Sequence, residues 1–331
     1  MSNIIKRTVE RENLSAVFFC EFFHSKIVYM KEKIREEQGL VSKLKYKYQL
    51  NVNGRYAESA LTMKYAEGKA MIIIGEKLNG SIPSVAKAIA EKDADLIRER
   101  AKMQSEAGAT FLDVCASVEE DVEVETLKWM IDLVQEVSDT PICIDSPSAR
   151  SCVAAIPFCK KPGLINSVSL EGDKIDTIFP VIADTDWECV ALLCDNDGIP
   201  DSVERRMKIF FGIMEKAKQY HIAPSRLHID PLVVTLGTDQ TALTVFADCC
   251  RRIKYEYPEI HITSGLSNIS FGLPVRKNIN QAFMVLAMNA GMDSAIVDPT
   301  NKNMIGMIYA TDALLERDEY CLNYIEKFNA K

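Results

Sequence analysis

Several features that mark common classes of protein are missing from this sequence. No apolar run approaches the roughly 18 residues that a membrane-spanning helix needs, so no membrane anchor is expected. The four histidines are scattered, and no group of histidines and cysteines has the spacing of a zinc site. The chain carries a net charge of -8 and no basic cluster, which argues against binding to nucleic acid or to an anionic membrane.

Signatures of phosphate binding and of nucleophilic catalysis are missing as well. The sequence contains no P-loop, no three-glycine dinucleotide fingerprint and no G-x-S-x-G nucleophile elbow. The ten cysteines include no C-x-x-C pair. We therefore expect reduced thiols that fill space in the core, in a reducing compartment such as the cytoplasm.

The first 70 residues differ in character from the rest. They contain 13 Lys and Arg against 8 Asp and Glu, whereas residues 71–331 contain 26 against 39. One charged helix is predicted over 26–38, and 40–70 is polar without a clear period. We expect residues 1–70 to be an N-terminal extension, either a poorly packed appendage or a stretch upstream of the natural start. Residues 71–331 are predicted to form the folded domain.

From Met71 onward, short apolar stretches alternate with amphipathic ones eight times. The predicted strands cover 71–75, 110–116, 141–146, 163–169, 189–195, 227–233, 261–268 and 294–299. The predicted helices cover 93–107, 122–137, a stretch through 153, 173–184, 201–219, 239–254, 278–290 and 303–316. Eight such units predict a (β/α)8 TIM barrel of the α/β class. A doubly wound open sheet is the alternative, but the first strand leads into GEKLNG, without the glycine fingerprint that usually accompanies that fold.

Polar side chains gather at the predicted C-terminal strand ends, where TIM barrels place their active sites. The residues are Glu76, Asn79, Asp113, Asp145, Asn166, Asp230, Asn268 and Asp298. Taken alone, Asp113 or Asp298 could equally cap a helix or bond its own loop. Carboxylates gathered in one mouth repel each other and lose hydration, so such a cluster needs a partner.

Two kinds of partner suit this set of side chains. One is a Mg²⁺ ion held by oxygen ligands, and the other is an organic heterocycle with several N–H donors. Two Asp and two Asn fit the edge of a pterin better than a sugar or a phosphate. A phosphate would require Lys, Arg or a glycine nest.

Seven of the eight predicted strands carry motifs that are recognisable together. MIIIGEKLNG, FLDVCA, ICIDS, LINSVS, HIDPLV, GLSNISFGLPVR and AIVDPT occur in this order. The segment 71–331 resembles the methyltetrahydrofolate:corrinoid protein methyltransferases. These include the acetogen enzyme that serves the corrinoid iron–sulfur protein and the second methyltransferases of anaerobic demethylation systems. The folate module of cobalamin-dependent methionine synthase is similar but more distant.

The resemblance implies a barrel that binds tetrahydrofolate or methyltetrahydrofolate in its mouth. A methyl group would pass between folate N5 and the cobalt of a cobalamin (corrinoid) carried on a separate protein. The resemblance implies that Asp145, Asn166 and Asp230 hold the pterin ring. It places Asn268 beside N5 as the catalytic residue, because a carboxamide can donate a hydrogen bond there without titrating. The other substrate-binding candidates are Gly265 and Ser267 under the ring, and Asp113, Glu76, Asn79, Phe271 and Arg276.

The sequence departs from the family pattern at two positions. Cys115 replaces an Asn two residues after the strand-two Asp, and Phe271 replaces a Gln three residues after Asn268. Phe271 could stack on or border the ligand. Arg276 could meet the folate tail or the corrinoid partner, and a surface salt bridge is its structural alternative. For Asn268 the alternative is a side-chain cap on the following loop.

Other functions remain as alternatives at this point. A dihydropteroate synthase shares the barrel and the pterin pocket, but its basic residues for pyrophosphate are lacking here. A non-catalytic folate-binding component of a corrinoid complex is the second alternative. By resemblance we expect a homodimer without a bound metal. Transfer from methylcorrinoid to tetrahydrofolate is the favoured direction.

Overall fold

The structure, a computed structural model, describes residues 70–329. The predicted N-terminal extension therefore lies outside the described residues except for Ala70, and so does the helix predicted over 26–38. Among the described residues, none of the helices combines the length and the apolarity required to cross a membrane.

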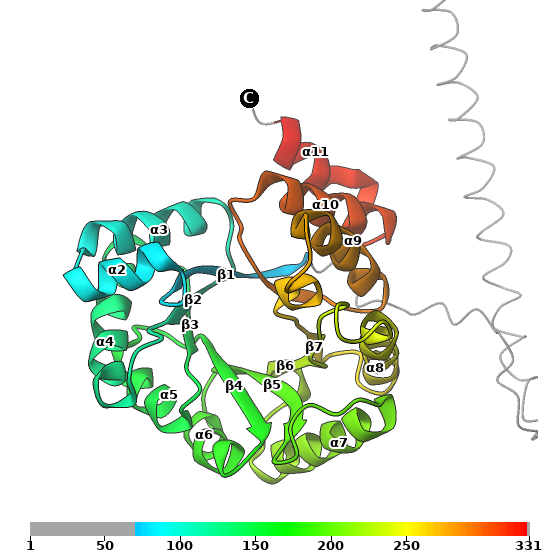
Figure 1. Ribbon diagram of the computed structural model, residues 1–331, viewed down its shortest axis with the longest axis horizontal. Helices are drawn as coiled ribbons and strands as arrows, with labels where there is room; N and C mark the ends of the chain where they lie inside the picture. The colour runs from blue at the N-terminus through cyan, green and yellow to red at the C-terminus, as the bar shows by residue number, and fades with distance from the viewer. Residues whose placement is uncertain (1–69, 330–331) are drawn as a thin grey trace, which may run out of the picture. The chain divides into compact units, whose positions relative to one another are not determined.

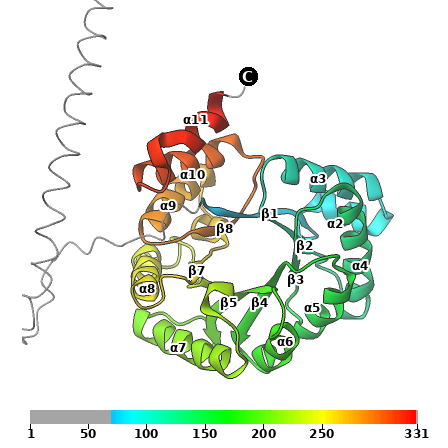
Figure 2. The ribbon, with the colours of Figure 1, turned by 180° about the vertical axis from the view of Figure 1, so that it is seen from behind.

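Eight parallel strands form the centre of the described part, as Figures 1 and 2 show from its two ends. They are β1 (Ile72–Asn79), β2 (Phe111–Cys115), β3 (Ile142–Asp145), β4 (Leu164–Leu170), β5 (Glu188–Asp195), β6 (Leu227–Asp230), β7 (His261–Ile262) and β8 (Ser294–Val297). Their order is β7-β6-β5-β4-β3-β2-β1-β8. The ring closes where Ile296 N donates to Ser264 O at 3.1 Å, beside a bridge between Gly265 and Ile296. The predicted TIM barrel is confirmed.

Helices alternate with the strands and surround them (Figure 1). They are α2 (Pro83–Glu91), α3 (Ala94–Glu106), α4 (Glu120–Val137), α5 (Ala149–Ala155), α6 (Lys174–Ile182), α7 (Val203–Gln219), α8 (Ala242–Glu256), α9 (Arg276–Asn289), α10 (Lys302–Leu314) and α11 (Leu322–Asn329). Short 3₁₀ turns are η1 (Ile156–Phe158), η2 (Pro224–Arg226), η3 (Leu266–Ser270) and η4 (Glu319–Cys321). Asp93 begins α3 as predicted, since its side chain accepts a hydrogen bond from Leu96 N.

The sequence interpretation missed two helices, α2 and α11. For α2 a usable signal existed, because Pro83 stands at the first helical position and Val85, Ala88 and Ile89 follow at helical spacing and are buried. All of α11 lies beyond the last predicted helix, which was expected over 303–316.

The seventh strand is the main correction to the predicted elements. It was expected over 261–268, but β7 contains only His261 and Ile262. The chain then turns at Gly265 and forms η3, in which Asn268 N donates to Gly265 O at 3.1 Å. Asn268 therefore lies on a 3₁₀ turn and not on a strand. Glycine at 265, where an added Cβ would meet Asn268, allows this tight turn.

Candidate active site at the mouth of the barrel

Strand register brings three of the predicted side chains to one level at the C-terminal end of the barrel. Asn79 on β1 is paired with Cys115 on β2, Cys115 with Asp145 on β3, and Asp145 with Asn166 on β4. Backbone hydrogen bonds between neighbouring strands fix these pairs. The predicted grouping of Asn79, Asp145 and Asn166 at the mouth is therefore present in the fold.

Asp113 and Asp145 are two carboxyl groups on the neighbouring strands β2 and β3. Burial raises the pKa of Asp113 well above its usual value, and the nearby charge of Asp145 raises it further. Burial also raises the pKa of Asp145, although hydrogen bonds from Cys115 and Asp113 oppose that shift. A protonated Asp113 can donate to an ionised Asp145, which keeps the second carboxylate available as an acceptor. Asn166 Nδ2 also lies 3.4 Å from Asp113 Oδ1, so Asp113 supports both neighbours.

Asp230 ends β6 in a separate, deeply buried position. Burial raises its pKa to about 6, although backbone N–H groups of Leu232 and Gly265 favour the charged form. The Leu232 N–H donates to Asp230 Oδ1 at 2.7 Å. Arg206 on α7 is itself buried, and its guanidinium donates to the carbonyl oxygens of Pro231 and Leu232, both at 2.7 Å. Arg206 thus fixes the loop that carries Asp230 and adds a positive charge nearby.

Sequence reasoning did not identify Arg206. A signal was present, because Arg206 falls on the buried face of α7 together with Met207, Phe210 and Ile213. A charged residue on such a face indicates a specific hydrogen-bonding role.

Asn268 is exposed at the mouth, in the middle of η3. Within residues 70–329 its carboxamide makes no hydrogen bond, so the alternative role as a side-chain cap of the following loop is not supported. A Cβ atom added to Gly265 would lie 3.1 Å from Asn268 Nδ2. The absence of a side chain at Gly265 therefore makes room for the Asn268 carboxamide. The backbone N–H of Gly265 donates to Asp230, so the two predicted site residues meet at this glycine.

Arg276 turns back onto η3 instead of pairing with a carboxylate. Its Nη2 donates to Ser267 O at 2.7 Å and its Nε to Ser270 Oγ at 3.0 Å. The guanidinium also lies 5.8 Å from the ring centroid of Phe271. The structure thus gathers Ser267, Phe271 and Arg276 around Asn268, and Arg276 fixes the backbone beside it.

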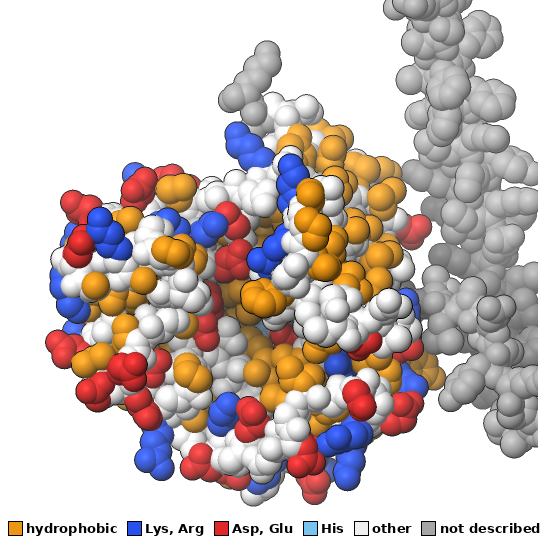
Figure 3. All heavy atoms as spheres, viewed as in Figure 1, with side chains coloured by type: hydrophobic (Ala, Val, Ile, Leu, Met, Phe, Trp, Pro, Cys, Tyr) orange, Lys and Arg blue, Asp and Glu red, His pale blue; other side chains and the backbone are white. Residues whose placement is uncertain are grey.

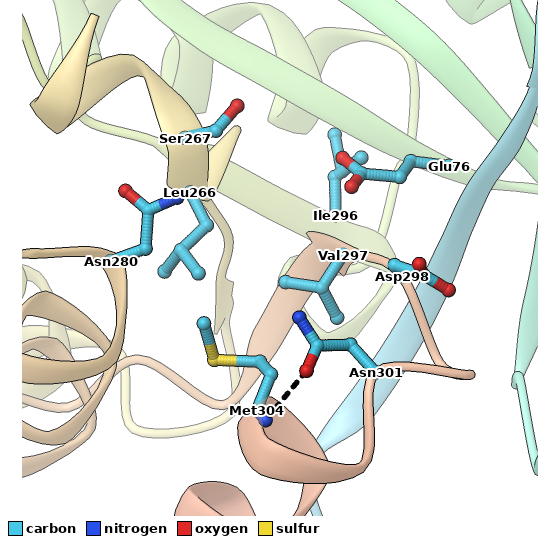
Figure 4. A pocket seen from close by; sticks show the side chains of 9 residues that line it. All are labelled: Glu76, Leu266, Ser267, Asn280, Ile296, Val297, Asp298, Asn301 and Met304. Carbon is cyan, nitrogen blue, oxygen red and sulfur yellow. Dashed lines mark hydrogen bonds between the residues drawn. The ribbon is translucent and has the colours of Figure 1, made fainter. Parts of the chain in front are cut away.

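Glu76 lines a small pocket of about 60 Å³ between β8, η3, α9 and α10 (Figure 4). Burial raises the pKa of Glu76, and the nearby positive charge of Lys77 opposes that shift. Lys77 Nζ lies 2.9 Å from Asp298 Oδ2. Asp298 Oδ1 also accepts from Thr300, so the alternative reading of Asp298 as a residue that bonds its own loop is supported.

Two asparagines that sequence reasoning missed also line this pocket. Asn280 Oδ1 is buried and has no hydrogen-bond partner among the described residues. Asn301 caps α10 through a bond from Met304 N at 3.2 Å, which Figure 4 marks with a dashed line. The pocket is therefore polar on the sides of Glu76, Asn280 and Asn301.

The end of the barrel that faces the viewer in Figure 3 is hollow at its centre, and acidic side chains gather around the hollow with apolar ones on one side. Within the described residues, no group of three or more His, Cys, Asp or Glu is arranged to hold a metal ion. Burial raises the pKa of the Cys115, Cys143 and Cys194 thiols, which suits space-filling residues rather than nucleophiles.

A closed (β/α)8 barrel whose mouth presents carboxyl groups and carboxamides offers hydrogen-bond donors and acceptors of the kind that a polar heterocycle requires. The chain belongs to the pterin-binding enzyme family, whose model matches residues 75–298.

Comparisons with known proteins refine this assignment. The chain is 54% identical over 260 residues to the methylcorrinoid:tetrahydrofolate methyltransferase of Eubacterium limosum, a match that covers 78% of this chain and 96% of that protein. It is 28% identical over 263 residues to the methionine synthase of Mycobacterium leprae, with 76% of this chain matching 22% of that protein.

Solved structures of dihydropteroate synthase share the fold. One from Yersinia pestis has a TM-score of 0.56 and 16% identity, covering 75% of this chain and 94% of its own. At this identity the likeness shows the barrel alone, so it lends no support to dihydropteroate synthase activity.

Proposed function

We propose that this protein transfers a methyl group between a methylated corrinoid protein and N5 of tetrahydrofolate. The observation that carries the proposal is the mouth itself. Asp145 and Asn166 stand on the neighbouring strands β3 and β4, and Asp230 ends β6. The carboxamide of Asn268 is exposed and makes no hydrogen bond within residues 70–329. The relative in Eubacterium limosum, which bears the name of this reaction, supports the same activity.

The direction we infer is from methylcorrinoid to tetrahydrofolate. The N5 lone pair attacks the methyl carbon, the cobalt–carbon bond breaks, and both of its electrons stay on cobalt as Co(I). N5 then releases its proton to solvent. Asn268 can accept a hydrogen bond from N5–H and can donate one to the N5 lone pair in the reverse reaction, because a carboxamide has both groups. A hydrogen bond that strengthens as charge develops on N5 lowers the activation free energy of methyl transfer.

The remaining residues bind and orient the pterin. Asp145 and Asp230 accept from its N–H groups, and Asn166 offers both a donor and an acceptor. Correct placement matters because an in-line displacement needs its reacting atoms aligned. We assign supporting positions around the ring to Asp113, Glu76, Asn79, Gly265 and Ser267. We place Phe271 and Arg276 at the rim of the mouth, where they border the pterin site without holding the ring.

We infer that the corrinoid arrives on a separate protein, as the resemblance to the methyltetrahydrofolate:corrinoid protein methyltransferases implies. We also infer a homodimer in the cytoplasm. The nine described cysteines are all free, which supports a reducing compartment. The reaction as proposed needs no metal other than the cobalt of its substrate.

The test follows corrin absorbance in two mixtures. Methylcobalamin with tetrahydrofolate is expected to yield cob(I)alamin, and cob(I)alamin with methyltetrahydrofolate tests the reverse direction. Activity in either mixture should collapse in Asn268→Ala. Folate binding without transfer, both from free methylcobalamin and from a methylated corrinoid protein, would replace the proposal with the non-catalytic folate-binding role.

A further inference from the structure

The segment that follows η3 places apolar side chains in solvent. Residues 271–275, here called the rim loop, read FGLPV. Phe271 is 70% exposed and Val275 is 62% exposed, whereas Ile269 just before them is 1% exposed. An exposed large apolar side chain forgoes the stabilisation that burial would give it, so two of them within five residues need an explanation.

The rim loop is held firmly although its side chains are not packed. Thr235 Oγ1 donates to the carbonyl oxygen of Phe271 at 2.7 Å, and Leu273 N donates to Ser270 O at 3.0 Å. Leu236 N donates to Ile269 O at 3.0 Å, which ties the loop after β6 to η3. A preformed apolar surface of this kind loses little conformational entropy when a partner covers it.

Two further features show that the loop conformation is specific. Val275 has a φ of 48°, a left-handed conformation that β-branched residues rarely adopt. Arg276 lies against one side of the Phe271 ring while it anchors η3 through Ser267 O. The surrounding hydrogen bonds hold the aromatic ring at the mouth and not in the core.

The rim loop is directly continuous with Asn268. Phe271 N donates to Asn268 O at 3.2 Å, within the same 3₁₀ turn. The exposed ring of Phe271 therefore stands three residues from the exposed carboxamide of Asn268. The pterin, by contrast, is matched by the carboxyl and carboxamide groups inside the mouth.

We propose that the rim loop is the surface on which the corrin ring of the methyl donor rests during transfer. This inference rests on the proposed function. The corrin ring is a broad, largely apolar plate whose cobalt must come within bonding distance of a methyl group beside Asn268. An aromatic ring and a branched aliphatic side chain at the mouth provide apolar contact for such a plate, and a polar pterin would gain less from them.

The test separates corrinoid recognition from folate recognition. The double variant Phe271→Ser, Val275→Ser is assayed for transfer from methylcobalamin at saturating tetrahydrofolate, and for tetrahydrofolate affinity by calorimetry. The KM for methylcobalamin is expected to rise about tenfold, which is the scale of truncating one buried anchor, and the tetrahydrofolate Kd to change less than about twofold. Leu314→Ser is the control, because Leu314 is 80% exposed at the end of α10.

A binding measurement keeps the inference testable without turnover. Cyanocobalamin, which cannot donate a methyl group, is titrated into the wild-type protein and the double variant. Weaker binding by the double variant supports the inference even if the proposed transfer fails. Equal binding and equal KM would overturn it. So would a loss confined to tetrahydrofolate affinity, or a change of oligomeric state in sedimentation that identifies the loop as an interface between copies.

Discussion

At the scale of single residues, the proposed catalysis depends most directly on the carboxamide of Asn268. It needs no change of protonation to act, and glycine at 265 gives it room. Its neighbours fix the backbone of η3 through Arg276 and Ser267. The side chain is therefore preorganised by contacts that do not use its own polar atoms, which leaves both of them for substrate.

Replacing Asn268 with Ala should lower kcat about a hundredfold or more, the scale seen when one donor to a developing charge is removed. Tetrahydrofolate binding should change only a few-fold, because the pterin is held mainly by other residues. Steady-state transfer from methylcobalamin and calorimetry measure the two effects. A variant with wild-type kcat and much weaker folate binding would show that Asn268 only binds substrate.

Asp230 should make folate binding depend on pH. Burial raises its pKa to about 6, so below that value the carboxyl is protonated and accepts N–H groups poorly. Tetrahydrofolate affinity should therefore rise between pH 5 and about pH 7 and then level off. Asp230→Asn should bind more weakly and with a flatter profile. Titration of tetrahydrofolate itself affects the wild type and the variant equally. If affinity changed with pH to the same extent in both, the pH dependence could not be assigned to Asp230.

At the scale of elements, the neighbouring strands β1 and β2 approach each other closely beside the site. Gly80 follows β1 directly, and its N–H donates to Cys115 O at 2.8 Å. A Cβ atom at Gly80 would lie 2.0 Å from the carbonyl oxygen of Ala116. The pairing of Asn79 with Cys115, and through it the level of Asp145, depends on this close approach.

Gly80→Ala should lower the free energy of unfolding by about 1–3 kcal/mol, because the backbone contact cannot relax without separating β1 from β2. Urea unfolding at pH 7 measures this. Gly237→Ala is the matched control, since its added Cβ would have only ordinary contacts at 3.6 Å and beyond. Equal stability of the two variants would mean that the strands adjust without cost.

At the scale of the whole barrel, its two ends differ in the polar groups that they carry. The C-terminal end carries the candidate pterin-binding residues. At the N-terminal end, side-chain bonds support the junction between the short strand β7 and the start of β8. There Asp293 accepts from Ile262 N at 2.8 Å, from Lys254 Nζ at 2.7 Å and from the His261 ring at 3.1 Å. These bonds join α8, β7 and β8. Polar groups at this end of a TIM barrel serve stability more than function.

Asp293→Asn should destabilise the fold by about 2 kcal/mol at pH 7. Burial opposes ionisation of Asp293, but the hydrogen bond from His261 and the charge of Lys254 hold its pKa at about 2. A depressed carboxyl pKa contributes stability above the unfolded value near 4, and this is lost as pH falls toward 2. The difference between wild type and variant in urea unfolding should therefore shrink below pH 4. A constant difference would assign the effect to packing alone. Tetrahydrofolate affinity should not change.

Much of the fold could be predicted because the burial pattern is local. Each short apolar stretch followed by an amphipathic one signals one strand and one helix, and eight of them in order indicate the barrel. The residues at the strand ends then follow from chain order, which placed Asp145, Asn166 and Asp230 at the mouth before any coordinates. The motifs between 71 and 300 also carried the family resemblance that the comparisons bear out.

Only the tertiary structure decided the finer arrangement. The early end of β7, the turn of Arg276 onto Ser267 and the burial of Arg206 beneath Pro231 depend on partners distant in the sequence. The sequence by itself determined the barrel and which residues reach its mouth, since periodicity and chain order are properties of neighbours along the chain. Which of those residues bond to one another, which fix a loop and which remain exposed was decided by pairing across the barrel, where burial and hydrogen bonding between separate strands set the outcome.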